Sequence, residues 1–130
     1  MKKIAFTYGS FDCLDRQHYH LVKEMRKLVL PFNEIVVIIP DNYVHFVQHK
    51  CFPIQSLEHR QENLAYLTKK IVVSYSLDIN LVFNKLITDA ELAGDKLIYV
   101  GYDDDKDFPG REFIKARNVP IKFIKKYAGK

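Results

Sequence analysis

The sequence predicts an α/β protein with a doubly wound, five-stranded parallel sheet and helices on both faces. Short apolar runs rich in β-branched residues alternate with longer stretches in which apolar residues recur at helical spacing. This alternation is typical of parallel strands joined by crossover helices. The chain has 130 residues, 48% of them hydrophobic and 28% charged, which is a size and composition typical of one globular domain.

The apolar runs predict five strands, and the amphipathic stretches between them predict four helices. We expect strands at residues 3–8, 34–39, 71–73, 97–101 and 121–124, and helices at residues 18–30, 56–70, 79–92 and 110–117. Ser56 suits an N-cap because its hydroxyl can accept a backbone N–H, and Glu58 then lies in the first turn, where negative charge is favoured. Gly94 suits the end of the third helix.

Several features of the chain narrow its class. It shows no internal repeat and no linker rich in Gly, Pro or Ser, so we expect a single domain over residues 1–130. The two cysteines, Cys13 and Cys51, lack C-x-x-C spacing, which predicts neither a disulfide framework nor a zinc site. No signal peptide or long apolar segment is evident, so we expect a cytoplasmic protein without a membrane partner. The net charge of +4 suits an anionic ligand, but this excess is too small to predict nucleic acid binding.

The most informative segment, residues 9–20, joins the first predicted strand to the first predicted helix. It reads Gly-Ser-Phe-Asp-Cys-Leu-Asp-Arg-Gln-His-Tyr-His. Backbone N–H groups at a helix start are unpaired, and the helix dipole adds positive charge there, so such a turn can bind phosphate. Ligands of doubly wound sheets bind at the carboxyl ends of the strands. We therefore expect this segment to share one rim with Asp41 and residues 102–105.

Residues 9–18 resemble the G-x-F-D-x-x-H-x-G-H signature of the cytidylyltransferase-like nucleotidyltransferases, the family that includes glycerol-3-phosphate cytidylyltransferase. Asp15 replaces the first histidine of the signature, and Gln17 replaces its second glycine. The resemblance implies a Rossmann-like fold and a nucleotide site on this segment. The four matching residues are Gly9, Phe11, Asp12 and His18.

Helical spacing decides which histidine matches the second histidine of the signature. In the family, apolar residues follow that histidine at positions +3, +4 and +7, on the buried face of the helix. From His18 these positions hold Leu21, Val22 and Met25, whereas from His20 they hold Lys23, Glu24 and Lys27. Only the first set forms an apolar stripe. His18 is therefore the candidate ligand, and His20 is expected at the surface.

Two further segments resemble family motifs that neutralise phosphate charge, K-H-K and S-x-E-x-R. Lys50 matches the second lysine of the first motif, which contacts the α-phosphate in the family, and Gln48 stands in place of the first. Arg60 matches the arginine of the second motif, and its forked guanidinium is suited to phosphate. The residues alone leave another interpretation open, in which Lys50 is a solvated loop lysine and Arg60 pairs with a glutamate of its own helix.

The end of the fourth predicted strand resembles the family segment G-D-D-W, which closes around the base and ribose. Gly101 and Asp103 match, Tyr102 replaces the first aspartate, and Asp104 replaces the tryptophan. The alternative is a solvated acidic turn or an adventitious cation site.

The family also carries an R-T-x-G-I-S-T-T segment that helps to bind the triphosphate. Lys126 lies where its arginine would be and Gly129 where its glycine would be, and the hydroxyl residues have no counterpart.

The resemblance implies transfer of a nucleoside monophosphate, CMP from CTP rather than AMP from ATP, to a phosphorylated alcohol with release of pyrophosphate. Mg²⁺ would accompany the nucleoside triphosphate, and homodimers are common in such families. His18 would hold the outer phosphates, while Lys50 and Arg60 would neutralise the transferring group. The implied nucleotide-binding residues are Gly9, Ser10, Phe11, Asp12, Asp15, Gly101, Tyr102, Asp103 and Lys126.

The departures from the motifs leave a second hypothesis, a nucleotide-binding or protein-interaction module that keeps the fold without turnover. Asp15 is the main reason, because a carboxylate about 5 Å from a phosphate charge is repelled by about 3 kcal/mol at an effective dielectric constant near 20. Three arrangements would avoid this repulsion. Asp15 could turn away, bind a Mg²⁺ ion that bridges to the phosphates, or cap the helix that begins near His18.

Overall fold

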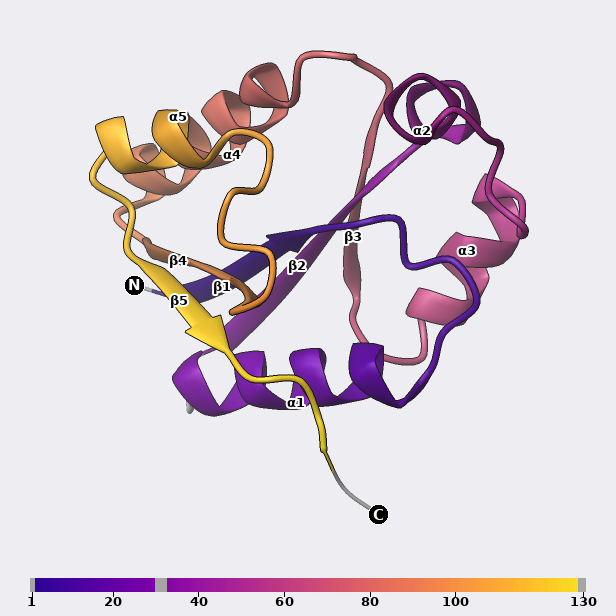
Figure 1. Cartoon of the computed structure of the whole chain (residues 1–130). Helices are drawn as coiled ribbons and strands as arrows, with labels where there is room; N and C mark the ends of the chain where they lie inside the picture. The colour runs from indigo at the N-terminus through magenta and orange to yellow at the C-terminus, as the bar shows by residue number, and fades with distance from the viewer. Residues whose placement is uncertain (1, 30–32, 129–130) are drawn as a thin grey trace.

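A computed structural model describes residues 2–29 and 33–128, and its centre is a parallel sheet with the strand order β3-β2-β1-β4-β5 (Figure 1). This confirms the predicted doubly wound, Rossmann-like sheet. β1 and β5 begin and end as predicted, and the other three strands are each one residue longer at both ends. The strands are β1 (Lys3–Tyr8), β2 (Asn33–Pro40), β3 (Lys70–Ser74), β4 (Lys96–Tyr102) and β5 (Ile121–Ile124).

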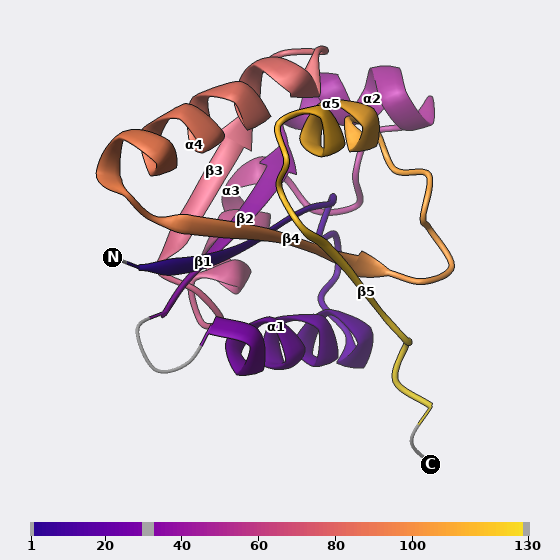
Figure 2. The same cartoon turned by 90° about the vertical axis from the view of Figure 1, so that its left-hand side faces the viewer.

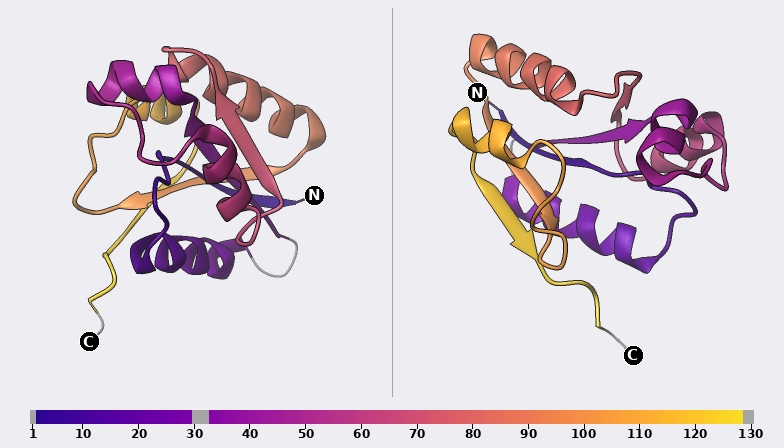
Figure 3. Two further views of the ribbon diagram at one scale, coloured as in Figure 1. Left: turned by 90° about the vertical axis from the view of Figure 1, so that its right-hand side faces the viewer. Right: turned by 45° about the horizontal axis from the view of Figure 1, so that its top comes forward.

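The helices cover both faces of the sheet, as predicted. Figure 2 shows α1 below the sheet and α4 and α5 above it. Figure 3 shows α2 and α3 at the end of the molecule opposite the amino terminus. Within the described residues, no helix is both long enough and apolar enough to cross a bilayer. The helices are α1 (Arg16–Val29), α2 (Asn42–His49), α3 (Leu57–Leu64), α4 (Ile79–Ala93) and α5 (Arg111–Ala116).

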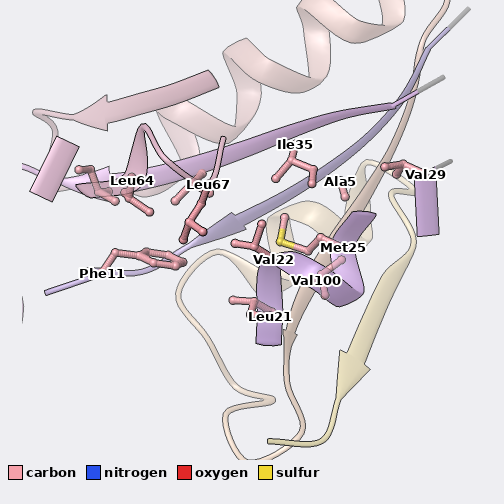
Figure 4. Packing of buried hydrophobic residues seen from close by; sticks show 12 residues of the cluster. Ala5, Phe11, Leu21, Val22, Met25, Val29, Ile35, Leu64, Leu67 and Val100 are labelled. Carbon is pink, nitrogen blue, oxygen red and sulfur yellow. The ribbon is translucent and has the colours of Figure 1, made fainter. Parts of the chain in front are cut away.

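Each face of the sheet carries its own hydrophobic core, because successive side chains of a strand point to opposite faces. On one face, residues from β1 and β2 pack against α1 and α3, with Met25, Leu64 and Leu67 at the contact (Figure 4). The core on the other face is rich in aromatic side chains. The ring of Phe6 meets that of Phe83 edge-on at a centroid distance of 5.8 Å, and Tyr99 stacks on Phe108 at 4.1 Å.

The predicted helix over residues 56–70 is wrong in length, since α3 ends at Leu64. Ser56 is its N-cap, as predicted, and accepts the N–H of His59. Beyond Leu64 the chain turns, Thr68 Oγ1 donates to the carbonyl of Ile35 at 2.6 Å, and β3 begins. Leu67 and Ile71 continue the helical spacing from Leu64, so the sequence pattern runs on through the turn into the strand.

The sequence predicts no helix between the second strand and Ser56, yet α2 lies there. Asp41 is its N-cap and accepts the N–H of Val44 at 2.7 Å. Only Val44 and His45 of this helix are buried, and its other apolar residues are exposed. With apolar residues on both faces, α2 lacks the periodic pattern that predicts a helix.

The remaining helix ends differ from the prediction by one or two residues. α1 begins at Arg16 rather than His18, and its predicted last residue, Leu30, lies outside the described residues. α4 ends at Ala93, and Gly94, with a φ of 73°, is its C-cap as predicted. Gly110, with a φ of 87°, precedes α5, and a Cβ there would lie 2.5 Å from the ring of Phe83. This close approach requires glycine.

Candidate functional site

The candidate site lies at the carboxyl edge of the sheet, beside the point where the strand order reverses between β1 and β4. The loop from Gly9 to Asp15 leaves β1 at this edge and enters α1, while Asp41 follows β2 directly. Tyr102 ends β4 at the same edge. The structure thus brings the predicted segments to one rim.

The β1–α1 loop has an unusual backbone. Phe11 and Cys13 have φ values of 49° and 54°, which side-chain-bearing residues rarely adopt. The Phe11 ring is buried and lies 5.0 Å from the ring of His18. A Cβ on Gly9 would come within 3.2 Å of that Phe11 ring. The glycine of the motif therefore makes room for the motif's own phenylalanine.

Asp12 links the β1–α1 loop to the loop between α2 and α3. Its Oδ2 accepts the N–H of Ile54 at 2.6 Å, and its Oδ1 accepts the N–H of Gln55 at 2.8 Å. Gln55 returns the contact, because its Oε1 accepts the N–H of Cys13 at 3.0 Å. Both carboxylate oxygens of Asp12 are thus engaged by backbone, and its role in binding a nucleotide stays a prediction.

Asp15 caps α1, which is one of the three arrangements considered for it. Its Oδ1 accepts the N–H groups of Gln17 at 2.9 Å and His18 at 3.3 Å. In return, the N–H of Asp15 donates to Nδ1 of His18 at 3.1 Å. This reciprocal arrangement corresponds to a capping box with histidine at the third helical position. Two of the N–H groups expected to face a phosphate are therefore already bonded.

Burial sets the protonation state of His18, and the cap sets its tautomer. Burial lowers the pKa of His18, an effect that outweighs the opposing influence of Asp15 and Asp12. Because Nδ1 accepts the N–H of Asp15, the proton of the neutral ring is on Nε2. His18 is thereby a neutral residue whose Nε2–H is left to donate.

Arg60 lies beneath the rim with no exposed surface. Its Nη1 donates to the carbonyls of Ser10 at 3.2 Å and Pro40 at 2.8 Å, and its Nη2 donates to Oδ1 of Asn42 at 3.0 Å. Burial lowers the pKa of Arg60, against the opposing influence of nearby acidic groups. Within the described residues Arg60 forms no ion pair, so the alternative of pairing with a glutamate of its own helix is wrong.

Tyr102 joins β4 to the start of α1, since its hydroxyl donates to the carbonyl of Gln17. Burial, with Asp15 and Asp104 adding to it, raises the pKa of Tyr102 to about 12, so the phenol keeps its proton at neutral pH. Lys126 lies 5.3 Å from the centre of the Tyr102 ring and pairs with Asp104 at 2.9 Å.

Two other predicted residues at this end of the sheet have structural contacts. The N–H of Asp103 donates to the carbonyl of Ile124 at 2.8 Å. A Cβ on Gly101 would lie 3.3 Å from the Tyr99 ring. Gly129 lies outside the described residues.

Lys50 is the exposed C-cap of α2, with a φ of 61° and its N–H bonded to the carbonyl of Phe46. The last turn of α2 lies beside the end of β1, because the hydroxyl of Tyr8 donates to Oε1 of Gln48 at 2.9 Å. The structure thus brings Lys50 to the same end of the sheet as His18 without showing a contact between the two side chains.

Gln17 is the residue at this site whose role the sequence did not predict. Its Nε2 donates to the carbonyl of Tyr127 at 2.8 Å, and its Oε1 accepts the N–H of Tyr127 at 2.7 Å. The only signal in the sequence is that Gln17 replaces a glycine of the motif, which provides an amide where the family has no side chain.

The described residues form no ready-made metal site. No cluster of three or more His, Cys, Asp or Glu side chains in residues 2–29 and 33–128 is arranged to hold a metal ion. The carboxylates of Asp12 and Asp15 accept backbone N–H groups instead. Magnesium typically binds through substrate phosphates with few protein ligands.

The strand order and the rim define a Rossmann-like α/β protein. Among solved structures, it is similar to the crystal structure of the lipopolysaccharide core biosynthesis protein from Thermoplasma volcanium GSS1. The TM-score is 0.69 at 21% sequence identity, over 98% of this chain and 99% of that one. This likeness shows the fold. No protein-family model matches the chain, and no curated protein matches it.

Proposed function

We propose that the protein is a nucleotidyltransferase that transfers a nucleoside monophosphate, from CTP in preference to ATP, to a phosphorylated alcohol. The observation that carries the proposal is the state of His18 in the first turn of α1. The N–H of Asp15 binds its Nδ1, which leaves a neutral ring with Nε2–H to donate to a phosphate oxygen. The resemblance of residues 9–18 to the family signature supports the same role.

The proposed reaction needs little proton chemistry. A phosphate oxygen of the acceptor attacks the α-phosphorus in line, a new P–O bond forms, and the bond to the leaving pyrophosphate breaks. Catalysis of this kind comes from orientation and from neutralising charge on the phosphates. In our proposal His18 holds the outer phosphates, Lys50 neutralises the transferring group, and Mg²⁺ bound to the triphosphate neutralises the rest.

We assign Arg60 a positioning role in this reaction. Its guanidinium is buried and holds the carbonyl of Ser10, two residues after β1, and that of Pro40, the last residue of β2. The backbone of Gly9 and Ser10 would then be fixed for close approach of the nucleotide. Tyr102 at the end of β4, Asp103 directly after it and Lys126 after β5 would contact the base, ribose or phosphates.

One observation favours a second candidate, a module that binds a nucleotide or a protein without turnover. Asp15 occupies two N–H groups at the start of α1, where the family signature has a histidine. A phosphate there would meet a carboxylate instead of free donors.

The test is release of pyrophosphate from Mg²⁺ with each nucleoside triphosphate and a panel of phosphorylated alcohols. We expect release with CTP and one acceptor, lost in His18→Ala and retained in His59→Ala, a control at an exposed histidine on α3. Circular dichroism checks that both variants fold. If no pair releases pyrophosphate but a nucleotide raises the melting temperature of the wild type more than that of His18→Ala, the binding module is correct. If neither effect occurs, nucleotidyl transfer and nucleotide binding are both rejected.

A further inference from the structure

A groove lies between the outer face of α1 and the C-terminal tail, which we define as residues 125–128. Five side chains line it, and its volume is about 400 Å³. Those from α1 lie three, four and seven residues apart, so they share one face of the helix. We call this the α1–tail groove. Its lining residues are Arg16, Tyr19, His20, Lys23 and Tyr127.

The tail is held against α1 by hydrogen bonds, so the groove is preformed. The amide of Gln17 bonds both the N–H and the carbonyl of Tyr127, at 2.7 and 2.8 Å. Nε2 of His20 donates to the carbonyl of Lys125 at 3.0 Å. The guanidinium carbon of Arg16 lies 5.6 Å from the centre of the Tyr127 ring.

The groove carries uncompensated positive charge. Arg16 and Lys23 lie about 10 Å apart along the helix axis, one at each end of the groove. Neither forms an ion pair within residues 2–29 and 33–128, and none of the five lining residues is acidic. The two acidic residues next to them in the sequence are engaged elsewhere, because Asp15 caps α1 and Glu24 pairs with Lys27 at 3.4 Å.

Aromatic rings form the walls between these charges. Tyr19 is 52% exposed and Tyr127 is 42% exposed, although both are large and partly apolar. Exposed tyrosine rings beside basic residues are the combination by which proteins bind nucleotides, because the ring stacks on a base and the cations bind phosphate. A volume of about 400 Å³ is within the range of small-molecule sites.

We propose that the α1–tail groove binds a nucleotide, with its phosphate between Arg16 and Lys23 and its base against Tyr19. The ligand would be either a free mononucleotide or one residue of a single-stranded nucleic acid, which share this chemistry. The groove is separate from the rim, because His18 packs against Phe11 while Arg16 and Tyr19 are exposed. The inference does not depend on the proposed nucleotidyl transfer.

The test is a titration of the ¹⁵N-labelled protein with CMP, inorganic phosphate and a short single-stranded oligonucleotide, followed by ¹H–¹⁵N spectra. We expect saturable shifts at the amides of Tyr19, His20, Lys23 and Tyr127. CMP should bind more tightly than inorganic phosphate, because only CMP offers a base to stack. If the oligonucleotide binds more tightly than CMP, the ligand is a single-stranded nucleic acid. If the two bind equally, the ligand is a free mononucleotide. Shifts confined to Gly9, Ser10 and Tyr102 would overturn the proposal.

Variants separate this groove from nonspecific charge attraction. Lys23→Ala should weaken CMP binding about tenfold, the loss expected for one charge-assisted hydrogen bond. Lys85→Ala removes the same charge from an exposed position on α4 and should leave the affinity unchanged. Equal losses in both variants, or no loss in Lys23→Ala, would reject the groove.

The tail supplies a second, independent variant. Gln17→Ala removes both side-chain bonds to Tyr127 but no lining group, so it should open the groove and weaken CMP binding. His18→Ala should leave the groove shifts intact, which keeps this result distinct from the assay for nucleotidyl transfer. Unchanged CMP affinity in Gln17→Ala, with Tyr127 amide shifts showing a released tail, would contradict the proposal.

Discussion

At the start of α1, Asp15 and His18 satisfy each other's unpaired hydrogen-bonding groups, so a carboxylate stabilises the helix and the helix orients an imidazole. Asp15 accepts two backbone N–H groups, and His18 accepts the N–H of Asp15. A positively charged phosphate-binding histidine and a neutral capping histidine are different chemical groups. His18 is a neutral capping histidine, and it would bind phosphate through its neutral Nε2–H.

We predict that Asp15→Ala lowers the free energy of unfolding by about 1 kcal/mol, because it removes the side-chain cap of α1. Asp15→Asn should lose much less, since its amide oxygen can still accept the N–H groups of Gln17 and His18. Urea denaturation measures both. Asp89→Ala, at an exposed acidic residue on α4, is the control for loss of one negative charge. An unchanged stability in Asp15→Ala would show that the cap is dispensable.

His18 predicts a specific pH dependence of stability. Burial lowers the pKa of His18 in the folded protein below its value in the unfolded chain. Between these two pKa values the unfolded chain binds a proton that the native state does not bind. Stability is therefore complete above about pH 6.5 and is lost as the pH falls through the folded pKa. Burial and His45 lower the pKa of His49 as well, so His49 adds to the same trend.

The variant His18→Gln isolates this contribution, because glutamine can accept the N–H of Asp15 but does not titrate. We expect its loss of unfolding free energy between about pH 7.5 and about pH 5.5 to be smaller than that of the wild type. Urea denaturation at both pH values measures it. His59→Gln should behave as the wild type, and an equal pH dependence in all three proteins would contradict the assignment.

Arg60 holds three acceptors beneath the rim, so its loss should cost more than a surface cation would. Arg60→Met keeps most of the side-chain volume but leaves the carbonyls of Ser10 and Pro40 without their donor. We expect the free energy of unfolding to fall by about 3 kcal/mol, from unpaired buried acceptors. Arg60→Lys should lose less unfolding free energy than Arg60→Met but remain less stable than the wild type, because an ammonium lacks the planar fork of the guanidinium. Urea denaturation measures both, and a loss below about 1 kcal/mol would show that Arg60 does not hold the rim.

Among the elements, the sheet and α1 follow from sequence pattern, whereas α2 and the end of α3 do not. Strands with apolar residues on both faces stand out as continuous runs, and α1 has a clear apolar stripe. α2 is not predicted because its apolar residues Phe46 and Val47 are exposed and form no buried stripe. The motif locates the rim, but the contacts of Asp12 with Ile54 and of Arg60 with Ser10 join residues more than 40 positions apart in the chain. Local spacing carries no information about such contacts.

The link between the β1–α1 loop and the α2–α3 loop is testable at Asp12. Asp12→Ala removes the acceptor of the Ile54 and Gln55 N–H groups, so both amides should exchange with solvent faster. Amide hydrogen exchange followed by NMR measures this directly. The amide of Val44, bonded to Asp41 in the neighbouring helix, should keep its rate. If Ile54 and Gln55 exchange as in the wild type, Asp12 does not order this loop.

The molecule as a whole is two cores built on one sheet, an aliphatic core under α1 and α3 and an aromatic core under α4 and α5. β2 contributes consecutive residues to both. Because the strands contribute to both cores, we expect the two cores to unfold together. The rim at the carboxyl edge is therefore coupled to the packing on both faces.

This coupling predicts matched effects from two neighbouring residues of β2 that face opposite cores. Ile38 and Ile39 are both fully buried, the first in the aromatic core and the second in the aliphatic core. Ile38→Val and Ile39→Val should each lower the free energy of unfolding by about 1 kcal/mol, the usual cost of one buried methylene. Leu92→Val, at an exposed position, should change it by less than about 0.5 kcal/mol.

For each variant the urea transition should remain single, with the slope of the wild type, because the sheet unfolds as one unit. Far-ultraviolet circular dichroism reports the whole backbone, and tyrosine fluorescence is the available side-chain probe, since the chain has eight tyrosines and no tryptophan. Transitions from the two probes should coincide. If Ile38→Val separated them and Ile39→Val did not, the aromatic core would be able to open while the aliphatic core stayed folded.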